Sequence, residues 1–486
     1  MISEFDPTAS YESLYDICVV GTGPAGLTLA LELADRGFNI LLLEGGGLDY
    51  SDRSQDFYGC ESVGHEGWPK FSRLRYFGGT SNHWSGRCRP FEPSDFERKS
   101  MNGLPGWPIS YSSLEKYLSA SMKIIDLDET LGFRPINADL LTDHFYPDSS
   151  MQSPPTRFSE KYLDTIRNHE KIQCLYNATA VNLSLNDSHS STDSILVSDY
   201  NGRRSEFKAG KFILCLGGIE TPRFLLNCNK QLEKGIGNKH DMVGRCFMEH
   251  LNVPLGTFIY NNPDDFLRME FYTDTNFSNG LDIGNSNISL GIVQKVKSWG
   301  RTKAIKTFFK NISCKLDISE KVRFISDFKC PGMGKITTLM EQSPNLNSRI
   351  MLSKETDNMG LRRVKFDWQI NDYDRRTIEA VAFEFSKQFS KSQLGKVKLN
   401  DAIIAGSEPM KIDFGRHSHH MGTTRMSKSA YYGVVDENCK VHDLDNLYIA
   451  GSSVFPTGGA CNPTMPIIQI SLRLVEHISA LNRGSC

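Results

Sequence analysis

The chain has 486 residues, of which 39% are hydrophobic and 23% charged, and its formal net charge is −2. At about 150 residues per domain, this length predicts two or three lobes with a large buried core. The near-neutral charge argues against a general nucleic-acid or polyanion binder. The first 16 residues are acidic and lack the features of a secretory signal, and no run of about 18 apolar residues occurs. We therefore expect a cytoplasmic protein without a transmembrane segment.

The twelve cysteines form no C-x-x-C pair and show no metal-ligand spacing. We expect free thiols in a reducing compartment and no metal site.

Residues 15–46 predict a strand, a glycine turn, a helix and a second strand. The apolar run 17–20 is typical of a buried parallel strand, and the helix is expected from Pro24 to Arg36, ending at Gly37. The run 39–44 then forms the next strand.

The turn between these elements carries the pattern G-x-G-x-x-G, formed by Gly21, Gly23 and Gly26. Such glycines allow a tight turn, close approach of the backbone to a pyrophosphate, and close packing of helix on strand. The helix amino terminus then faces the phosphates. Glu44, at the end of the second strand, is placed to bind ribose hydroxyls. The pattern predicts a dinucleotide site but does not separate NAD from FAD.

Three later stretches are rich in glycine. Residues 74–87 (LRYFGGTSNHWSGR) predict a loop that brings backbone close to a flat ring. Residues 211–226 predict a buried strand, a glycine pair and a helix with Thr221 as its N-cap and Pro222 at its first position. Residues 446–478 predict a strand, a Gly/Pro loop and a final amphipathic helix.

Between the second and third of these stretches the pattern is mostly that of antiparallel strands. The segments SRIMLS and RRVKFDWQI alternate as strands do, and DRRTIEAVAFEFSKQF has helical spacing. No second nucleotide fingerprint occurs here, which disfavours a nicotinamide partner.

Taken in order, the fingerprint, GGTSNHW, GGIETPRFLL, VGRCFMEH, HHMGTTRM and VFPTGGACNP resemble the glucose–methanol–choline (GMC) flavoprotein oxidoreductases. The matches run from residue 15 to about 480, with 255–335 matching poorly, and are nearest to the branch of pyranose oxidases and bacterial sugar-alcohol dehydrogenases. The resemblance implies FAD and an α/β fold, in which a Rossmann-like domain assembled from discontinuous segments carries a substrate domain with a mostly antiparallel sheet and flanking helices.

The implied organisation has five segments. The FAD-binding domain takes 1–100, 171–250 and 406–486, the last carrying the catalytic pair, while 101–170 forms a mainly helical covering segment and 251–405 the substrate domain.

The resemblance also implies a catalytic pair. In the family, the histidine three positions before the glycine of H-x-x-G-T-x-R-M acts as base, and here this is His419. The neighbouring His417 and His420 fall outside the pattern and are expected to be structural or surface residues. The position that orients the substrate hydroxyl is Asn462, whose alternative role is that of a helix N-cap.

Further cofactor contacts follow from the same resemblance. They are expected at Gly78, Gly79, Thr80, Ser81, His83, Trp84, Val181, Gly217, Ser453, Pro463 and Thr464. His83 matches the histidine that is covalently bound to FAD in pyranose oxidases; alternatively, it forms a hydrogen bond near the flavin, with Trp84 packing beside it. His250 is expected to have a structural role at the domain junction.

The implied reaction is oxidation of an alcohol to a carbonyl, on a sugar, amino sugar or cyclitol, with hydride transfer to flavin N5. O2 or another non-NAD acceptor reoxidises the flavin. Two alternatives stay open: a redox-neutral lyase of the same family, and an inert flavin-binding or partner-binding protein.

Residues 295–329 carry ten Lys or Arg against three acidic residues, with apolar residues at helical spacing. The first interpretation is a helix packed on the core with a solvated lysine face. The second is contact with an anionic membrane surface or with a phosphate-bearing, lipid-linked or carrier-bound substrate.

Overall fold

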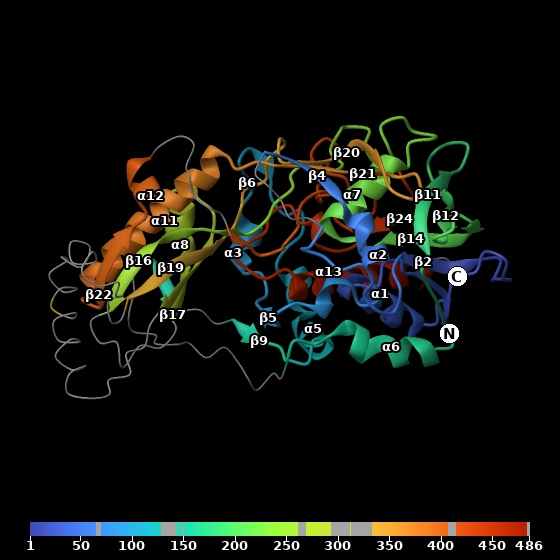
Figure 1. Ribbon diagram of the computed structural model, residues 1–486, viewed down its shortest axis with the longest axis horizontal. Helices are drawn as coiled ribbons and strands as arrows, with labels where there is room; N and C mark the ends of the chain where they lie inside the picture. Colours follow the sequence, from blue (N-terminus) through green and yellow to red (C-terminus); the bar gives the residue numbers. More distant parts are fainter. Residues whose placement is uncertain are drawn as a thin grey trace.

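The computed structural model describes residues 1–64, 70–127, 143–147, 150–260, 269–292, 312, 333–406 and 415–483. Figure 1 shows an elongated molecule with a group of parallel strands near one end and an antiparallel sheet near the other. Among the described residues, no helix is both long and apolar enough to cross a membrane. The basic stretch 295–329 lies outside the described residues, except for Ile312.

A six-stranded parallel sheet forms the centre of the first lobe, and its strand order is β1-β10-β3-β2-β14-β24. The strands are β1 (Ile2–Glu4), β2 (Tyr15–Val20), β3 (Ile40–Leu43), β10 (Ile172–Tyr176), β14 (Ala209–Leu214) and β24 (Leu447–Ile449). Strands that are distant in sequence are neighbours, because β14 lies between β2 and β24. The four residues of β3 are all buried, as expected for a strand covered on both faces.

Two helices complete this layer. Helix α1 (Pro24–Ala34) packs on β2 and β3, and helix α13 (Thr464–Arg483) packs along α1. Helix α1 is two residues shorter than expected, and Gly37 with φ of 96° follows it, its backbone N–H donating to the Ala34 carbonyl at 2.8 Å. The carboxyl ends of β2, β3 and β14 are left uncovered by these helices.

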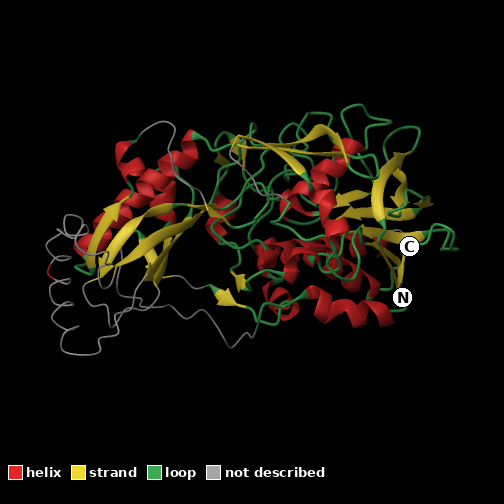
Figure 2. Ribbon diagram, in the orientation of Figure 1, coloured by secondary structure: helices red, strands yellow, loops and turns green. Residues whose placement is uncertain are grey.

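The second lobe is built on an antiparallel sheet with strand order β22-β16-β19-β18-β17-β8. The strands are β8 (Phe145–Pro147), β16 (Pro254–Tyr260), β17 (Met269–Thr273), β18 (Ser286–Ile292), β19 (Met333–Met340) and β22 (Gly395–Leu399), with β15 (Leu251–Asn252) and β23 (Gly415–Arg416) pairing at the edge. Helix α11 (Asp372–Lys391) lies beside this sheet in Figure 2. Its Phe385 and Phe389 rings pack on Phe271 and Phe258 at about 6 Å between centroids. The predicted fold class is confirmed.

Smaller sheets and shorter helices make up most of the remaining described chain. The antiparallel pair expected near 350 and 365 forms β20 (Arg349–Thr356) and β21 (Arg362–Trp368), to which β4 (Cys60–Gly64) adds in parallel. The other strands are β5 (Arg87–Cys88), β6 (Ser100–Met101), β7 (Leu104–Pro105), β9 (Met151–Gln152), β11 (Thr179–Leu185), β12 (Thr192–Ser198) and β13 (Arg204–Phe207). The other helices are α2 (Asp52–Gln55), α3 (Pro93–Glu97), α4 (Ser112–Glu115), α5 (Leu118–Ile124), α6 (Phe158–Asn168), α7 (Gly217–Asn227), α8 (Thr275–Gly280) and α12 (Asp401–Ala405).

The start of helix α7 corrects the prediction made for it. The helix begins at Gly217, so Thr221 is no N-cap and Pro222 lies inside the helix. A proline there has no N–H for the carbonyl of Gly218. The hydroxyl of Thr423 donates to that carbonyl at 2.6 Å and satisfies it. The proline is tolerated because a distant segment of the chain supplies the missing donor.

The nine cysteines in the described part of the chain are all free, and eight of them are buried.

Candidate active site

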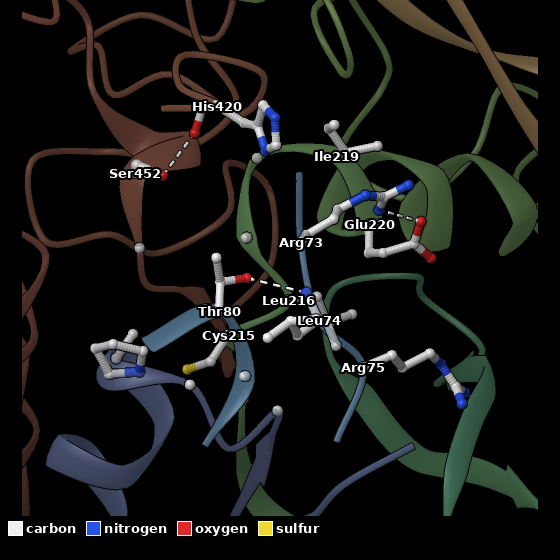
Figure 3. Close-up of a pocket in the computed structure, with 18 of the residues that line it drawn as sticks. Arg73, Leu74, Arg75, Thr80, Cys215, Leu216, Ile219, Glu220, His420 and Ser452 are labelled. Carbon is white, nitrogen blue, oxygen red and sulfur yellow. Dashed lines mark hydrogen bonds and ion pairs between the residues drawn. The ribbon is translucent and has the colours of Figure 1, made fainter. Parts of the chain in front are cut away.

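A cavity of about 580 Å³ opens at the carboxyl ends of β2, β3 and β14. Most of its wall comes from stretches far apart in sequence: 20–25, 43–45, 72–87, 178–180, 215–224, 417–420 and 450–467. Figure 3 shows part of this wall, where the loop after β14 passes close to His420 and Thr80. The cavity lies where nucleotide ligands bind in parallel α/β sheets, outside the carboxyl ends of the strands.

The three glycines of the fingerprint occupy different environments. Gly21 has φ of 105°, and a Cβ there would lie 2.6 Å from the carbonyl oxygen of Cys215. A Cβ on Gly26 would lie 1.8 Å from the carbonyl oxygen of Gly21, so Gly26 permits the packing of helix on turn. A Cβ on Gly23 would meet no atom within 4 Å. Gly23 therefore leaves free space in the cavity wall at the amino terminus of α1, where a phosphate fits.

Glu44 is buried at the end of β3 and lines the cavity. Its Oε1 accepts from the backbone N–H of Gly46 at 2.8 Å, and its Oε2 accepts from the backbone N–H and hydroxyl of Thr22. A carboxylate has about four acceptor positions. Glu44 thus holds the glycine turn in place and retains acceptor capacity for a ribose hydroxyl.

The glycine-rich loop of 74–87 lies against this turn. Gly78 and Gly79 both have positive φ, of 88° and 57°, and a Cβ on Gly79 would lie 3.2 Å from the Cα of Gly23. The Thr80 hydroxyl accepts from the backbone N–H of Leu74 at 3.3 Å and closes the loop (Figure 3). The loop therefore lines one side of the cavity with Gly79, Thr80, Ser81, His83 and Trp84.

His419 also lines the cavity, and two residues hold it in place. Its backbone N–H donates to Oε1 of Glu249 at 2.8 Å, and its Nδ1 is 2.7 Å from Nδ1 of His250. The pairing follows from backbone register, since Met248 and Met421 form an antiparallel bridge that places residue 250 opposite residue 419. The Nδ1 edge of His419 faces His250, which leaves the Nε2 edge for the cavity that His419 lines.

The other two histidines of the motif also line this cavity, rather than the outer surface. The ring of His417 stacks on that of His419, with centroids 5.6 Å apart. Nε2 of His420 is 3.0 Å from the Ser72 hydroxyl, and its carbonyl accepts from Ser452 at 2.6 Å (Figure 3).

Burial keeps these imidazoles neutral. It lowers the pKa of His250 and of His420 to about 3 and that of His417 to about 4. Burial, followed by the three neighbouring histidines, lowers the pKa of His419 well below its ordinary value. At neutral pH His419 has a lone pair available for a proton.

Asn462 lines the cavity next to the start of α13. The helix begins at Thr464, and the carbonyl of Pro463 accepts the first helical hydrogen bond, from Ile467 at 2.9 Å. Pro463 therefore occupies the N-cap position of α13, and Asn462 precedes it. The N-cap alternative for Asn462 does not match this geometry.

The structure gathers most of the predicted site residues around this cavity. Those that line it are Gly21, Gly23, Glu44, Gly79, Thr80, Ser81, His83, Trp84, Gly217, His419, Asn462, Pro463 and Thr464. Four others lie behind the wall: Gly26 and Gly78 pack within their turns, Val181 is buried beside Phe57 and Met359, and Ser453 is buried.

A buried ion network in the cavity wall was not predicted from the sequence. Arg73 donates to Glu220 at 2.6 Å, as Figure 3 shows, and Arg223 donates to Glu220 at 2.9 Å and to Asp357 at 2.5 Å. Burial would raise the pKa of Glu220, but Arg223 and Arg73 lower it to about 2. Charged residues this far apart in sequence carry no local signal of pairing.

Comparisons with known proteins show which proteins the chain is similar to. A family profile described as GMC oxidoreductase matches residues 344–471. The chain is 22% identical to 2-methyl-1,2-propanediol dehydrogenase of Mycolicibacterium austroafricanum, over 96% of this chain and 95% of that protein. It is 22% identical to 6'''-hydroxyparomomycin C oxidase of Streptomyces lividus, over 96% and 93% of the two chains.

The fold is similar to that of pyridoxine 4-oxidase from Mesorbium loti, with a TM-score of 0.59 and 17% identity, covering 95% of this chain and 99% of that one. The open space at Gly23, the acceptor Glu44 and the paired His419 fit a bound flavin dinucleotide and an alcohol. Residues 344–471 match the GMC oxidoreductases, and the chain is an FAD-dependent alcohol oxidoreductase.

Proposed function

We propose that the chain oxidises a CH–OH group of a sugar, amino sugar or cyclitol to a carbonyl, with His419 as the base and Asn462 orienting the hydroxyl. The observation that carries the proposal is the placement of a neutral His419, bonded through Nδ1 and lining a cavity that Asn462 also lines. Relatives named as a 6'''-hydroxyparomomycin C oxidase, a fructose dehydrogenase large subunit and a C-glycoside 3-oxidase support a carbohydrate-like substrate.

FAD, when bound, supplies the ring that accepts the hydride from the carbinol carbon. Gly21, Gly23 and the amino terminus of α1 would hold its pyrophosphate, and Glu44 would accept from its ribose. The loop from Gly79 to Trp84 lines the path toward His419.

The protein groups at the reacting end divide the remaining work. His419 takes the hydroxyl proton on Nε2, which is available because burial keeps the imidazole neutral. Asn462 donates from its side-chain amide to the substrate oxygen and does not compete for the proton. Loss of the hydroxyl proton to His419 and of a hydride from the carbinol carbon leaves a carbonyl compound as the product.

The test is anaerobic mixing of the oxidised protein with panels of sugars, amino sugars, cyclitols and simple alcohols, followed by flavin absorbance. We expect one class to bleach the flavin, and His419→Ala to slow bleaching by about 10²- to 10⁴-fold with FAD still bound. His189→Ala is the matched control, because His189 is exposed and does not line the cavity. Equal bleaching by wild type and His419→Ala would overturn the assignment of the base.

The same experiment distinguishes the alternatives. If no alcohol bleaches a flavin that dithionite still reduces, the result favours a lyase or an inert flavin-binding protein. If an alcohol does bleach the flavin, admitting O2 afterwards shows whether O2 or another acceptor reoxidises the enzyme.

The bond between His83 and FAD has a separate test. His83 is exposed and lines the cavity beside Trp84, so it is accessible to a cofactor. Mass spectrometry of the denatured protein shows covalent attachment as a mass gain of one FAD, which His83→Ala abolishes.

A further inference from the structure

A line of hydrogen bonds runs from a buried carboxylate to the proposed base. Oε1 of Glu341 accepts from the backbone N–H of Gly459 at 2.8 Å. Nε2 of His250 is 2.8 Å from the carbonyl oxygen of the same glycine, and Nδ1 of His250 is 2.7 Å from Nδ1 of His419. His250 thus stands between a backbone carbonyl and the base.

The partners of His250 determine which of its nitrogens carries hydrogen. The carbonyl of Gly459 can only accept, so Nε2 of His250 must be the donor. A neutral imidazole has one N–H, which leaves Nδ1 of His250 as an acceptor. Burial, which lowers the pKa of His250 to about 3, keeps this ring neutral.

The same reasoning extends to His419. Two nitrogens 2.7 Å apart need one hydrogen between them, and Nδ1 of His250 has none to give. His419 therefore carries its hydrogen on Nδ1 and has its lone pair on Nε2, the edge left for the cavity. A His419 with the opposite tautomer would face His250 with two lone pairs and present an N–H to the substrate.

We propose that His250 is a positioning residue that holds His419 in the tautomer able to accept the substrate proton. The proposal rests on the proposed function of His419 and adds the residue that prepares it. His250 itself is wholly buried and touches no cavity space, so it acts only through His419.

The arrangement also serves the state after proton transfer. The substrate O–H bond breaks, an Nε2–H bond forms on His419, and the resulting imidazolium donates through Nδ1 to the lone pair of His250. Hydrogen bonds from charged donors are about twice as strong as neutral ones. His250 therefore stabilises the charged form more than the neutral form, at the moment when the charge appears.

Neighbouring contacts hold the two rings in register. Oε1 of Glu249 accepts from the backbone N–H of both His250, at 2.9 Å, and His419, at 2.8 Å. The two rings meet nearly at right angles, with an interplanar angle of 87°. Because the backbone is fixed on both sides, a change of the His250 side chain tests the ring contact itself.

The experiment compares His250→Asn with His250→Leu. The two side chains have nearly the same size and shape, but only Asn has an oxygen that can accept from Nδ1 of His419. We expect FAD content and substrate Kd to stay near wild type in both variants. The rate of flavin reduction should fall by about 10²- to 10⁴-fold in His250→Leu and by no more than about tenfold in His250→Asn. Equal rates in the two variants would overturn the proposal, since a packing defect would affect both alike.

A second readout needs no catalysis and is made on the wild-type protein. In wild-type protein labelled with ¹⁵N-histidine, the nitrogen chemical shifts distinguish the two neutral tautomers of each ring. The signals of His419 are identified by their loss in His419→Gln, with His189→Gln as control. We expect His419 to be protonated on Nδ1; protonation on Nε2 would overturn the proposal.

The two proposals fail in different ways. If His419→Ala reduces the flavin at the wild-type rate, the proposed function is wrong. If His419→Ala is slow while His250→Leu matches His250→Asn, only the role of His250 is wrong.

Discussion

The two glycines Gly23 and Gly26 are predicted to respond in opposite ways to the same substitution. Gly23 has φ of −69° and ψ of −175°, which alanine adopts readily, and its added methyl group would meet no protein atom within 4 Å. Gly23→Ala should therefore leave the apoprotein unharmed, or stabilise it by about 0.4–1 kcal/mol through a less flexible unfolded chain.

The cost of Gly23→Ala should appear in cofactor binding. The methyl group would occupy the space where the pyrophosphate approaches the backbone, and it would break at least one hydrogen bond to a charged group, worth about 1.5–3 kcal/mol. Since about 1.4 kcal/mol corresponds to a factor of ten, FAD affinity should fall about ten- to a hundredfold.

Gly26→Ala is the matched control. Its methyl group would lie 1.8 Å from the carbonyl oxygen of Gly21, so the turn itself must move and the apoprotein should be destabilised. The assays are urea unfolding of the apoprotein and the ratio of flavin to protein absorbance after exposure to limiting FAD. A Gly23→Ala variant that fills with FAD as wild type does would show that the pyrophosphate is not at this turn.

Three further predictions concern proton binding and the packing of α7. Because burial lowers the pKa of His419 well below 6.5, the rate of flavin reduction should stay level from about pH 8 down to about pH 6, where an ordinary histidine base would lose activity. Stopped-flow measurement of flavin bleaching gives this rate, and a rate that halves near pH 6.5 contradicts the prediction. Burial and then Glu341 raise the pKa of Asp95 to about 7, so the folded state holds more protons than the unfolded state between about pH 4 and pH 7. The free energy of unfolding should therefore fall as pH rises through that range. Urea titrations should show a weaker fall in Asp95→Asn, and an identical fall would rule out this group. Thr423→Val keeps the side-chain shape but removes the hydroxyl that donates to the carbonyl of Gly218. The free energy of unfolding should fall by about 1–3 kcal/mol. An unchanged free energy of unfolding would contradict the prediction and show that water replaces the hydroxyl.

The parts of the fold with local signals were predictable from the sequence. The run of Gly21, Gly23 and Gly26 between two apolar strands has a period and a set of turn residues that admit few other structures, and β2, α1 and β3 follow it closely. The antiparallel pair β20 and β21 and the helix α11 were equally visible, because each alternates or repeats within one short stretch.

The start of α7 was not predictable, because its cause lies some 200 residues away. Thr221 followed by Pro222 is a good local signal for a helix start, but the hydroxyl of Thr423 removes the penalty that this signal depends on. Tertiary contacts of this kind override local preference.

The same reason explains the incomplete prediction of the site. His419 was identified from its motif, whereas the pairing of His250 with it depends on the antiparallel bridge between Met248 and Met421, which no local pattern announces. His250 was expected to have a structural role at the domain junction, and the structure places its ring against that of His419, the proposed base. His417 and His420 line the cavity for the same reason of register, and their neutral state comes from burial.

The order of the parallel strands along the chain has consequences for folding during translation and for cleavage of the chain. Strand β24 is the last of six to be translated, and the stretch that carries His419 precedes it by fewer than thirty residues. A nascent chain can fold the glycine turn and the ribose acceptor early, while the opposite wall of the cavity is still missing. A cut anywhere between β14 and His419 would leave one piece with the glycine turn and the other with the proposed base, so neither piece alone should carry out the proposed reaction.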